Sequence, residues 1–191
     1  MSVSLGFRIL RRARGLAVAA ADLRERWFGR TPELAQPDRL VFVCRGNICR
    51  SAFAEYVVRR RYPEIEVASA GLMVTRSVPS PSHAVEAGRE FDLDLATHRS
   101  RSILSIEDSS KTVYLVFEPW MSRESPMHEP AAEGRVFHLA AWSVPRRALI
   151  ADPYGCGLET FRRCFRIVDR SIDNLVGSWG RPEDLGQRGK R

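Results

Sequence analysis

Apolar residues along the chain fall into short continuous runs and longer stretches with helical spacing. Short runs rich in β-branched residues predict strands, while apolar positions recurring every three to four residues predict helices. From residue 39 onward the two kinds alternate, which is typical of parallel sheets. We expect strands at residues 40–43, 64–69, 112–118 and 135–139, and helices at 51–61, 83–91 and 157–179.

This alternation predicts a doubly wound α/β fold, with a four-stranded parallel sheet and helices on both faces. We expect residues 39–179 to form one domain. In such sheets a ligand binds at the carboxyl ends of the strands. The last helix carries its apolar residues on one side, and these are Leu158, Phe161, Phe165, Val168, Ile172 and Leu175.

The first 38 residues follow a different pattern. Apolar residues from Ile9 to Trp27 recur at spacings of four and three, which predicts a helix with one apolar stripe. The stripe suits a helix packed on the domain, a seam in a homodimer, or contact with a membrane surface, and its Ala-rich composition favours the first two. Residues 29–38 predict a linker and residues 180–191 a disordered polar tail.

The composition excludes several classes of protein. None of the apolar runs among the 191 residues is long enough to span a membrane, and we expect a cytoplasmic protein. The net charge of +7 fits a solvated, Arg-rich surface, so no nucleic-acid partner is predicted. Four cysteines without paired zinc spacing, in a chain with no secretory signal, predict free thiols, no metal and no cofactor.

The strongest chemical signal lies between the first strand and the first helix. Residues 43–51 read Val-Cys-Arg-Gly-Asn-Ile-Cys-Arg-Ser. A loop that closes from a strand onto a helix points its backbone N–H groups inward and binds phosphate. Gly46 and Asn47 tolerate the positive φ that such a loop needs, and Arg50 can place two N–H groups on phosphate oxygens. The stretch therefore predicts an anion cradle.

Cys44 lies at the floor of this predicted loop. The helix dipole and Arg50 both favour its thiolate near neutral pH, and a thiolate facing a bound phosphoryl group is a positioned nucleophile. Ser51 suits the helix N-cap, and its hydroxyl could also donate to the sulfur. Cys49 is either a small apolar filler of the loop or the partner of Cys44 in a reversible, protective disulfide.

A second element, Asp152-Pro153-Tyr154, follows the apolar run at 148–151. On the residues alone, a turn is the commoner explanation of Asp-Pro. A phosphatase acting on an aryl ester, however, needs a proton for the leaving oxygen. Beside a bound dianion the protonated carboxyl of Asp152 is favoured, and its carboxylate could later accept a proton from the attacking water.

Residues 43–51 resemble the signature of the low-molecular-weight protein tyrosine phosphatases, and the resemblance extends from about residue 39 to residue 176. It implies Cys44 as the nucleophile, Arg50 as the phosphate clamp and Asp152 as the general acid, matched by position to the acid loop of the family. The residues that it implies around the substrate are Arg45, Gly46, Asn47, Ile48, Cys49, Ser51 and Tyr154.

Two further matches are expected to support the loop. Ser69 and His98 resemble family residues that brace the Asn and Ser of the phosphate loop, although His98 could equally serve only the structure. The chain also departs from the family pattern at two places. Ala52 stands where Pro is usual, which matters little in a first helical turn. Gly155 stands where a second aromatic is common, which predicts looser specificity.

The resemblance implies a phosphotyrosine phosphatase that works through a cysteinyl-phosphate intermediate. An ionised Cys44 together with a protonated Asp152 requires an activity optimum on the acidic side of neutral. Bacterial relatives often oppose tyrosine kinases of polysaccharide export, so such a kinase is a candidate partner by analogy. Arsenate reductases share the fold, but they need relay cysteines that are absent between Cys49 and Asp152. Protein-arginine phosphatases carry Thr where Ile48 stands. A phosphate-binding module without turnover would need neither thiolate nor acid.

Overall fold

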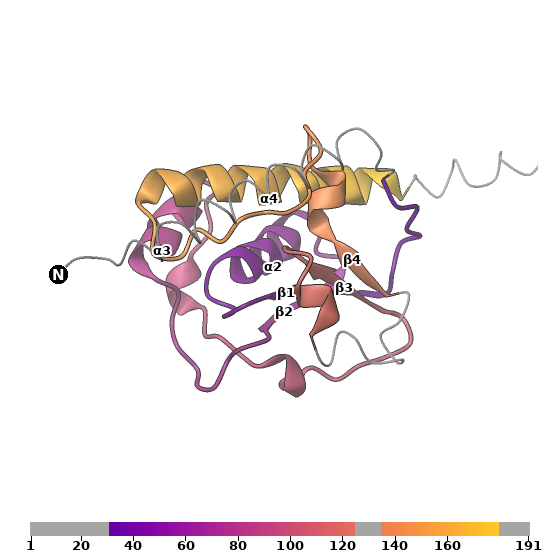
Figure 1. Cartoon of the computed structure of the whole chain (residues 1–191), viewed down its shortest axis with the longest axis horizontal. Coiled ribbons are helices and arrows are strands. Elements are labelled where there is room, and N and C mark those ends of the chain that lie inside the picture. Colours follow the sequence, from indigo (N-terminus) through magenta and orange to yellow (C-terminus); the bar gives the residue numbers. More distant parts are fainter. Residues whose placement is uncertain (1–30, 125–134, 180–191) are drawn as a thin grey trace, which may run out of the picture.

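The computed structural model of the chain describes residues 31–124 and 135–179. Within them lies a parallel sheet of four strands in the order β2-β1-β3-β4 (Figure 1). From β1 the chain adds β2 on one side and then β3 and β4 on the other, which is the predicted doubly wound arrangement. The strands are β1 (Arg39–Cys44), β2 (Glu66–Gly71), β3 (Thr112–Val116) and β4 (Val136–His138).

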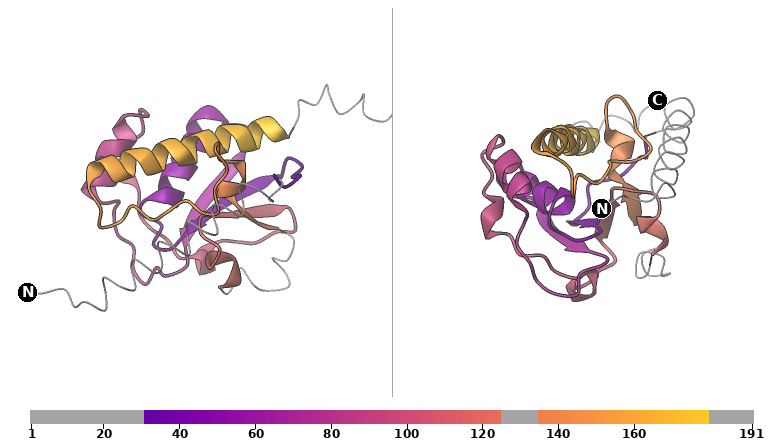
Figure 2. Two further views of the ribbon diagram at one scale, coloured as in Figure 1. Left: turned by 45° about the horizontal axis from the view of Figure 1, so that its top comes forward. Right: turned by 60° about the vertical axis from the view of Figure 1, so that its left-hand side comes forward.

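Three helices accompany this sheet in the described residues: α2 (Arg50–Arg61), α3 (Ser82–Arg89) and α4 (Leu158–Ser178). α2 packs against β1 and β2, and α4 lies across α2 and α3 (Figures 1 and 2). Phe53 of α2 stacks on Phe165 of α4, with ring centroids 4.0 Å apart. The strands and helices predicted for residues 39–179 are confirmed, with ends shifted by one or two residues.

Short 3-10 helices, which the apolar pattern did not predict, lie in the connections at Leu95–Thr97, Ile103–Ser105, Met121–Arg123 and Leu139–Trp142. They are short because each is a single turn closed by local capping or packing. Asp94 and Ser102, for example, cap the first two through their side chains. Their buried residues Leu95, Ile103 and Met121 join the core.

The two central strands are buried along almost their whole length, because strands inside a parallel sheet are covered on both faces. Residues 40–43 of β1 have no exposed surface, and Cys44 at its end is 3 % exposed. β1 lies between β2 and β3, where the order of the strands reverses. The loop that follows Cys44 therefore opens at the crevice where doubly wound proteins bind ligands.

The predicted N-terminal helix and the polar tail lie outside the described residues. The described part of the predicted linker, residues 31–38, contains no helix or strand. In the described part of the chain, no helix combines the length and apolar character that a membrane span requires. The division of the chain at residues 38 and 179 stays a prediction.

Candidate active site

The loop between β1 and α2 has one residue in the left-handed region. Of the two residues that tolerate positive φ, Asn47 adopts it, with φ of 52°, and Gly46 does not. Gly71 of β2 provides the close approach instead. A Cβ there would lie 2.9 Å from the backbone of Gly46 and Asn47, so only glycine lets the strand end pack on the loop.

The sulfur of Cys44 receives two contacts from this loop and the helix after it. The backbone N–H of Asn47 donates to Sγ at 3.2 Å, and the Ser51 hydroxyl lies 3.0 Å from Sγ. The expected contact between Ser51 and the sulfur is present, but Ser51 is not the N-cap. α2 starts one residue earlier with Cys49 at the cap position and no side-chain cap bond, so the Ser51 hydroxyl is free to face the sulfur.

The Asn47 side chain is held at both ends. Its Nδ2 donates to the hydroxyls of Ser51 at 3.0 Å and Ser69 at 2.7 Å, and its Oδ1 accepts from the Arg101 backbone N–H at 2.9 Å. The Asn47 carbonyl is 2.7 Å from Nε2 of His98, which must be the donor because a carbonyl only accepts. Ser69 and His98 therefore lie where the sequence placed them, bonded to the strained residue of the loop.

Buried charge lies behind this brace. The Ser69 hydroxyl donates to Glu55, a carboxylate with 3 % of its side chain exposed, and Arg59 and Arg101 form ion pairs with it. Burial lowers the pKa of His98 more than its bond to Asn47 raises it. The imidazole is therefore neutral at neutral pH, which suits the role of Nε2–H as a donor to the loop.

Among the described residues, Arg50 is the largest side chain that is fully buried. It contacts three other parts of the chain. Its Nη1 donates to Glu118 at 2.6 Å and to the Ile150 carbonyl at 2.9 Å, while Nη2 lies 3.0 Å from the Asp152 carboxylate. Burial lowers the pKa of Arg50, but Cys44, Asp152 and Glu118 together raise it more, so the guanidinium stays charged.

One edge of this guanidinium has no hydrogen-bond partner among the described residues. Both Nε and Nη2 of Arg50 are buried and make no hydrogen bond there, since the contact of Nη2 with Asp152 is an ion pair outside hydrogen-bond geometry. Nε and Nη2 form the side of the guanidinium that binds two oxygens of one anion. An oxyanion bound in the pocket could accept from both of these donors.

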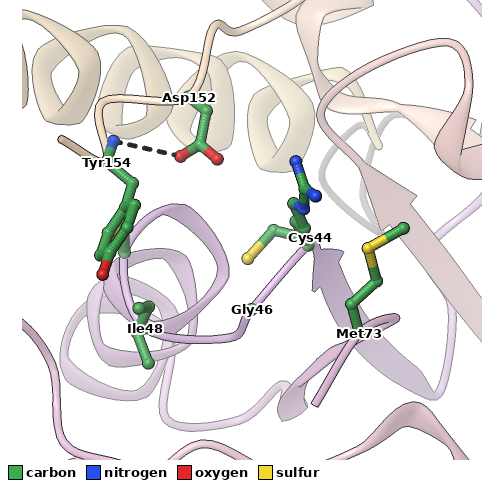
Figure 3. Close-up of a pocket in the computed structure, with 8 residues that line it drawn as sticks. Cys44, Gly46, Ile48, Met73, Asp152 and Tyr154 are labelled. Atoms are coloured by element: carbon green, nitrogen blue, oxygen red, sulfur yellow. Dashed lines mark hydrogen bonds between the residues drawn. The ribbon is translucent and has the colours of Figure 1, made fainter.

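The candidate acid stands on an exposed turn opposite Cys44 (Figure 3). Asp152 keeps 34 % of its side chain exposed, and its Oδ1 accepts from the Tyr154 backbone N–H at 3.3 Å. Gly155, at φ of 77°, turns the chain back toward α4. Together with the loop, the turn encloses a pocket of about 470 Å³ lined by Cys44, Arg45, Gly46, Ile48, Cys49, Met73, Asp152 and Tyr154.

Three residues of the site were missed by sequence reasoning. Glu118 follows β3 at the carboxyl edge of the sheet, and this position was a signal that could have found it. Gly71 carries no chemical group, and only its close approach to the loop makes it necessary. Met73, which is 51 % exposed and lines the pocket, had no signal in the sequence.

All four cysteines are free thiols in the structure. Burial raises the pKa of Cys49 well above its ordinary value, and Cys44 raises it further, so Cys49 is a neutral thiol against the loop. Cys164 of α4 lies beneath the acid turn, with its sulfur 3.7 Å from the Ala151 carbonyl. The disulfide between Cys44 and Cys49 stays a prediction.

The fold and the pocket together define a class of protein. It is a doubly wound α/β protein in which a loop suited to oxyanions, with a cysteine at its floor, follows the strand where the strand order reverses. The family model for low molecular weight phosphotyrosine protein phosphatase matches residues 39–188. The chain belongs to this family and is a cysteine-dependent phosphatase.

Individual relatives agree with this assignment. The probable low molecular weight protein-tyrosine-phosphatase EpsP of Ralstonia nicotianae is 31% identical over 72% of this chain and 92% of its own length. Vibrio vulnificus Wzb in complex with benzylphosphonate is similar in structure, with a TM-score of 0.65, 27% identity, and coverage of 74% of this chain and 97% of that one.

A relative that acts on a different phosphorylated residue is about as similar. The arginine phosphatase YwlE from Geobacillus stearothermophilus has a TM-score of 0.65 and 26% identity, covering 81% of this chain and all of that one. The overall fold therefore does not separate the two substrate classes, and any distinction has to come from residues of the pocket.

Proposed function

We propose that this chain hydrolyses phosphotyrosine in proteins through a cysteinyl-phosphate intermediate on Cys44. The observation that carries the proposal is the pairing of two groups across one pocket. The Cys44 sulfur lies at its floor, and the buried guanidinium of Arg50 keeps two donors without hydrogen-bond partners among the described residues. A sulfur nucleophile beside a guanidinium edge that can donate to two oxygens is suited to phosphoryl transfer.

Phosphate capture comes first in the proposed course. The Nε and Nη2 groups of Arg50 take two phosphoryl oxygens, and backbone N–H groups of the loop bind the rest. The phosphate dianion then competes with Asp152 for Nη2, which lies 3.0 Å from that carboxylate. Asp152 is left beside a dianion, where a protonated carboxyl is favoured.

The first chemical step breaks the ester. The Cys44 thiolate attacks phosphorus, an S–P bond forms, and the bond from phosphorus to the tyrosyl oxygen breaks as Asp152 gives that oxygen a proton. In the second step Asp152 takes a proton from water, which attacks phosphorus as the S–P bond breaks. The Ser51 hydroxyl, 3.0 Å from Sγ, stabilises the thiolate that leaves.

The walls of the pocket favour an aromatic ester. Ile48 and Tyr154 flank one side of the space above Cys44, and Met73 lies on the other (Figure 3). Side chains of this kind contact a phenyl ring well and offer few acceptors for a guanidinium. Protein-arginine phosphatase, the second candidate, is favoured by the similarity to YwlE alone.

The test is phosphate release from a phosphotyrosine peptide and a phosphoarginine peptide of matched sequence. We expect turnover of the tyrosine ester and loss of at least about 10⁴-fold in Cys44→Ser. Ile48→Thr serves as the selectivity variant, and it should reduce the ratio of kcat/KM for the phosphotyrosine peptide to kcat/KM for the phosphoarginine peptide. Faster turnover of the phosphoarginine peptide by the unmodified chain would overturn the substrate assignment.

The protein substrate that the family resemblance favours is a tyrosine kinase of polysaccharide export. The relatives named Wzb and EpsP are the reason to test such a kinase first. Its autophosphorylated form should lose phosphotyrosine when mixed with the full chain and keep it with Cys44→Ser.

A further inference from the structure

A second concave surface lies along α4, outside the catalytic pocket. It is a groove of about 200 Å³ between α4 and the connection that follows the last 3-10 helix. We call it the α4 groove and define it by its lining, which is Ser143, Val144, Pro145, Arg147, Arg163, Arg166, Ile167 and Arg170. Four of these eight residues are arginines.

The arginines of the α4 groove form a row. Arg163, Arg166 and Arg170 are three, then four, residues apart, so they lie on one face of the helix and extend over about 10.5 Å. Arg147 faces them from the opposite wall. Like charges at these spacings repel one another, and an anion lying along the row would relieve that repulsion.

The carboxylates of α4 mostly turn away from this row. Asp169 and Asp173 form ion pairs with Arg61 of α2, at 2.7 and 2.9 Å. Glu159 reaches the row through Arg166 at 2.9 Å, and it also contacts Arg162 at 3.7 Å. The charge of Arg170 also lowers the pKa of Asp169, although burial raises it more. Over the described residues, the four guanidinium groups of the groove therefore face two carboxylates, both of which are shared with arginines outside it.

The shape of the groove indicates what it binds. A row about 10.5 Å long matches about three residues of an extended peptide, which is longer than one phosphate. Apolar groups from Val144, Pro145 and Ile167 lie among the arginines, and Val144 is 73 % exposed. A narrow channel with charged walls and apolar contacts suits a peptide chain better than a flat bilayer surface.

The groove is connected to the catalytic acid by a short segment. Arg147 and Asp152 are five residues apart, so their Cα atoms are at most about 18 Å apart. The segment runs alongside α4 (Figure 1), where the Cys164 sulfur meets the Ala151 carbonyl at 3.7 Å. A substrate chain can therefore reach both places with about six residues between them.

We propose that the α4 groove binds an acidic segment of the protein substrate while its phosphotyrosine occupies the catalytic pocket. The proposal rests on the proposed function, since it adds a second contact for the same substrate. Carboxylates of the segment pair with Arg147, Arg163 and Arg170, and its apolar groups contact Ile167. Docking there lowers KM and leaves the chemistry at Cys44 unchanged.

The test compares phosphotyrosine peptides that carry four Glu, or four Gln, six residues from the phosphotyrosine on either side. The variant is Arg163→Glu/Arg170→Glu, two exposed residues of α4. The matched control is Arg89→Glu/Lys111→Glu, which makes the same charge change elsewhere. We expect the groove variant to raise KM about tenfold for the Glu peptide whose acidic residues lie on the side that reaches the groove. We expect kcat for that peptide, and KM for both Gln peptides, to stay unchanged.

Two results would overturn the proposal. One is equal KM for Glu and Gln peptides with the unmodified chain. The other is an equal rise of KM in the control variant, which would indicate a general field of the protein. Binding of phosphatidylserine vesicles that the groove variant abolishes, without any preference among peptides, would assign the groove to a membrane surface instead.

A binding measurement separates this proposal from the proposed function. Fluorescence anisotropy with a labelled, unphosphorylated Glu peptide should give the same Kd for the full chain and for Cys44→Ser, and a Kd about tenfold higher for the groove variant. If that holds and no phosphotyrosine is hydrolysed, the groove stands and the proposed function fails. If phosphotyrosine is hydrolysed and the peptide does not bind, only the groove proposal fails.

Discussion

The phosphate loop and the acid turn face each other across one pocket, yet they are built in opposite ways. Asn47 and Ser51 of the loop have no exposed surface, and the Asn47 side chain and carbonyl bond to four other residues. On the acid turn, Tyr154 is 63 % exposed, and Asp152 is contacted by its own turn and by Arg50.

This difference follows from what each region has to do. An anion site gains most when its donors are fixed before the ligand arrives, so the loop is braced from behind. A proton donor has to exchange protons with water between turnovers, so the acid turn stays at the surface. Substitutions of the residues that hold the loop from behind should therefore act mainly on stability, and substitutions in the turn mainly on activity.

After removal of the Cys44 nucleophile itself, the largest effect is expected at the acid turn. Asp152→Asn removes the proton donor and should lower kcat for phosphotyrosine about 10²- to 10³-fold, since general acid catalysis contributes on that scale. The loss should be smaller for p-nitrophenyl phosphate, whose leaving group needs less protonation. Equal losses with both substrates would contradict the assignment of Asp152. The free energy of unfolding, measured by urea titration, should change by less than about 1 kcal/mol, because the Asp152 carboxylate is partly exposed.

The next effect is expected in the loop. Asn47→Ala removes three side-chain hydrogen bonds and leaves alanine, which tolerates the left-handed region less well than asparagine, at φ of 52°, so it should lower the free energy of unfolding by about 3 kcal/mol. Asn47→Gly is the matched control, since it loses the same bonds without the strain. It should be about 1 kcal/mol more stable than Asn47→Ala in urea titrations. Equal stability of the two would show that φ at this position carries no cost.

Glu118 joins the two regions through Arg50. Its carboxylate accepts from Nη1 at 2.6 Å and from the Trp120 indole N–H at 3.1 Å. Glu118→Gln weakens the contact that orients the guanidinium and should lower kcat/KM about tenfold. Trp120→Phe keeps the Glu118 carboxylate, so its kcat/KM should fall less than that of Glu118→Gln. A larger loss in Trp120→Phe would mean that Glu118 acts through its position against Trp120 rather than through Arg50.

The smallest effect is a dependence of stability on pH. Burial holds the pKa of His98 below its unfolded value of 6.5. The unfolded chain therefore takes up a proton first as the pH falls, and the contribution of His98 is full above 6.5 and is lost below it. Between pH 7.5 and pH 5.0, urea titrations should show a larger fall in the free energy of unfolding for the unmodified chain than for His98→Gln. An equal fall in both proteins would exclude His98 as the cause of the pH dependence.

Sequence reasoning found what is local and missed what depends on packing. Cys44, Asn47 and Arg50 lie in one continuous motif between a strand and a helix, so their grouping followed from the order of elements. Glu118 and Gly71 reach the same loop from other strands, and their contacts depend on how β1, β2 and β3 align. The N-cap at Ser51 was wrong because the first turn of α2 already begins at Arg50, and the Ser51 hydroxyl contacts the sulfur and the Asn47 amide.

In the proposed course Cys44 carries the phosphoryl group during turnover. The direct test is rapid acid quench of the Asp152→Asn variant of the full chain with p-nitrophenyl phosphate, followed by mass spectrometry of the chain. Because p-nitrophenolate leaves with little help from a proton donor, whereas hydrolysis of the intermediate still needs the Asp152 carboxylate, we predict accumulation of one phosphoryl group per chain, located on Cys44. No phosphorylated chain, or a phosphoryl group on Cys49 in place of Cys44, would contradict the account.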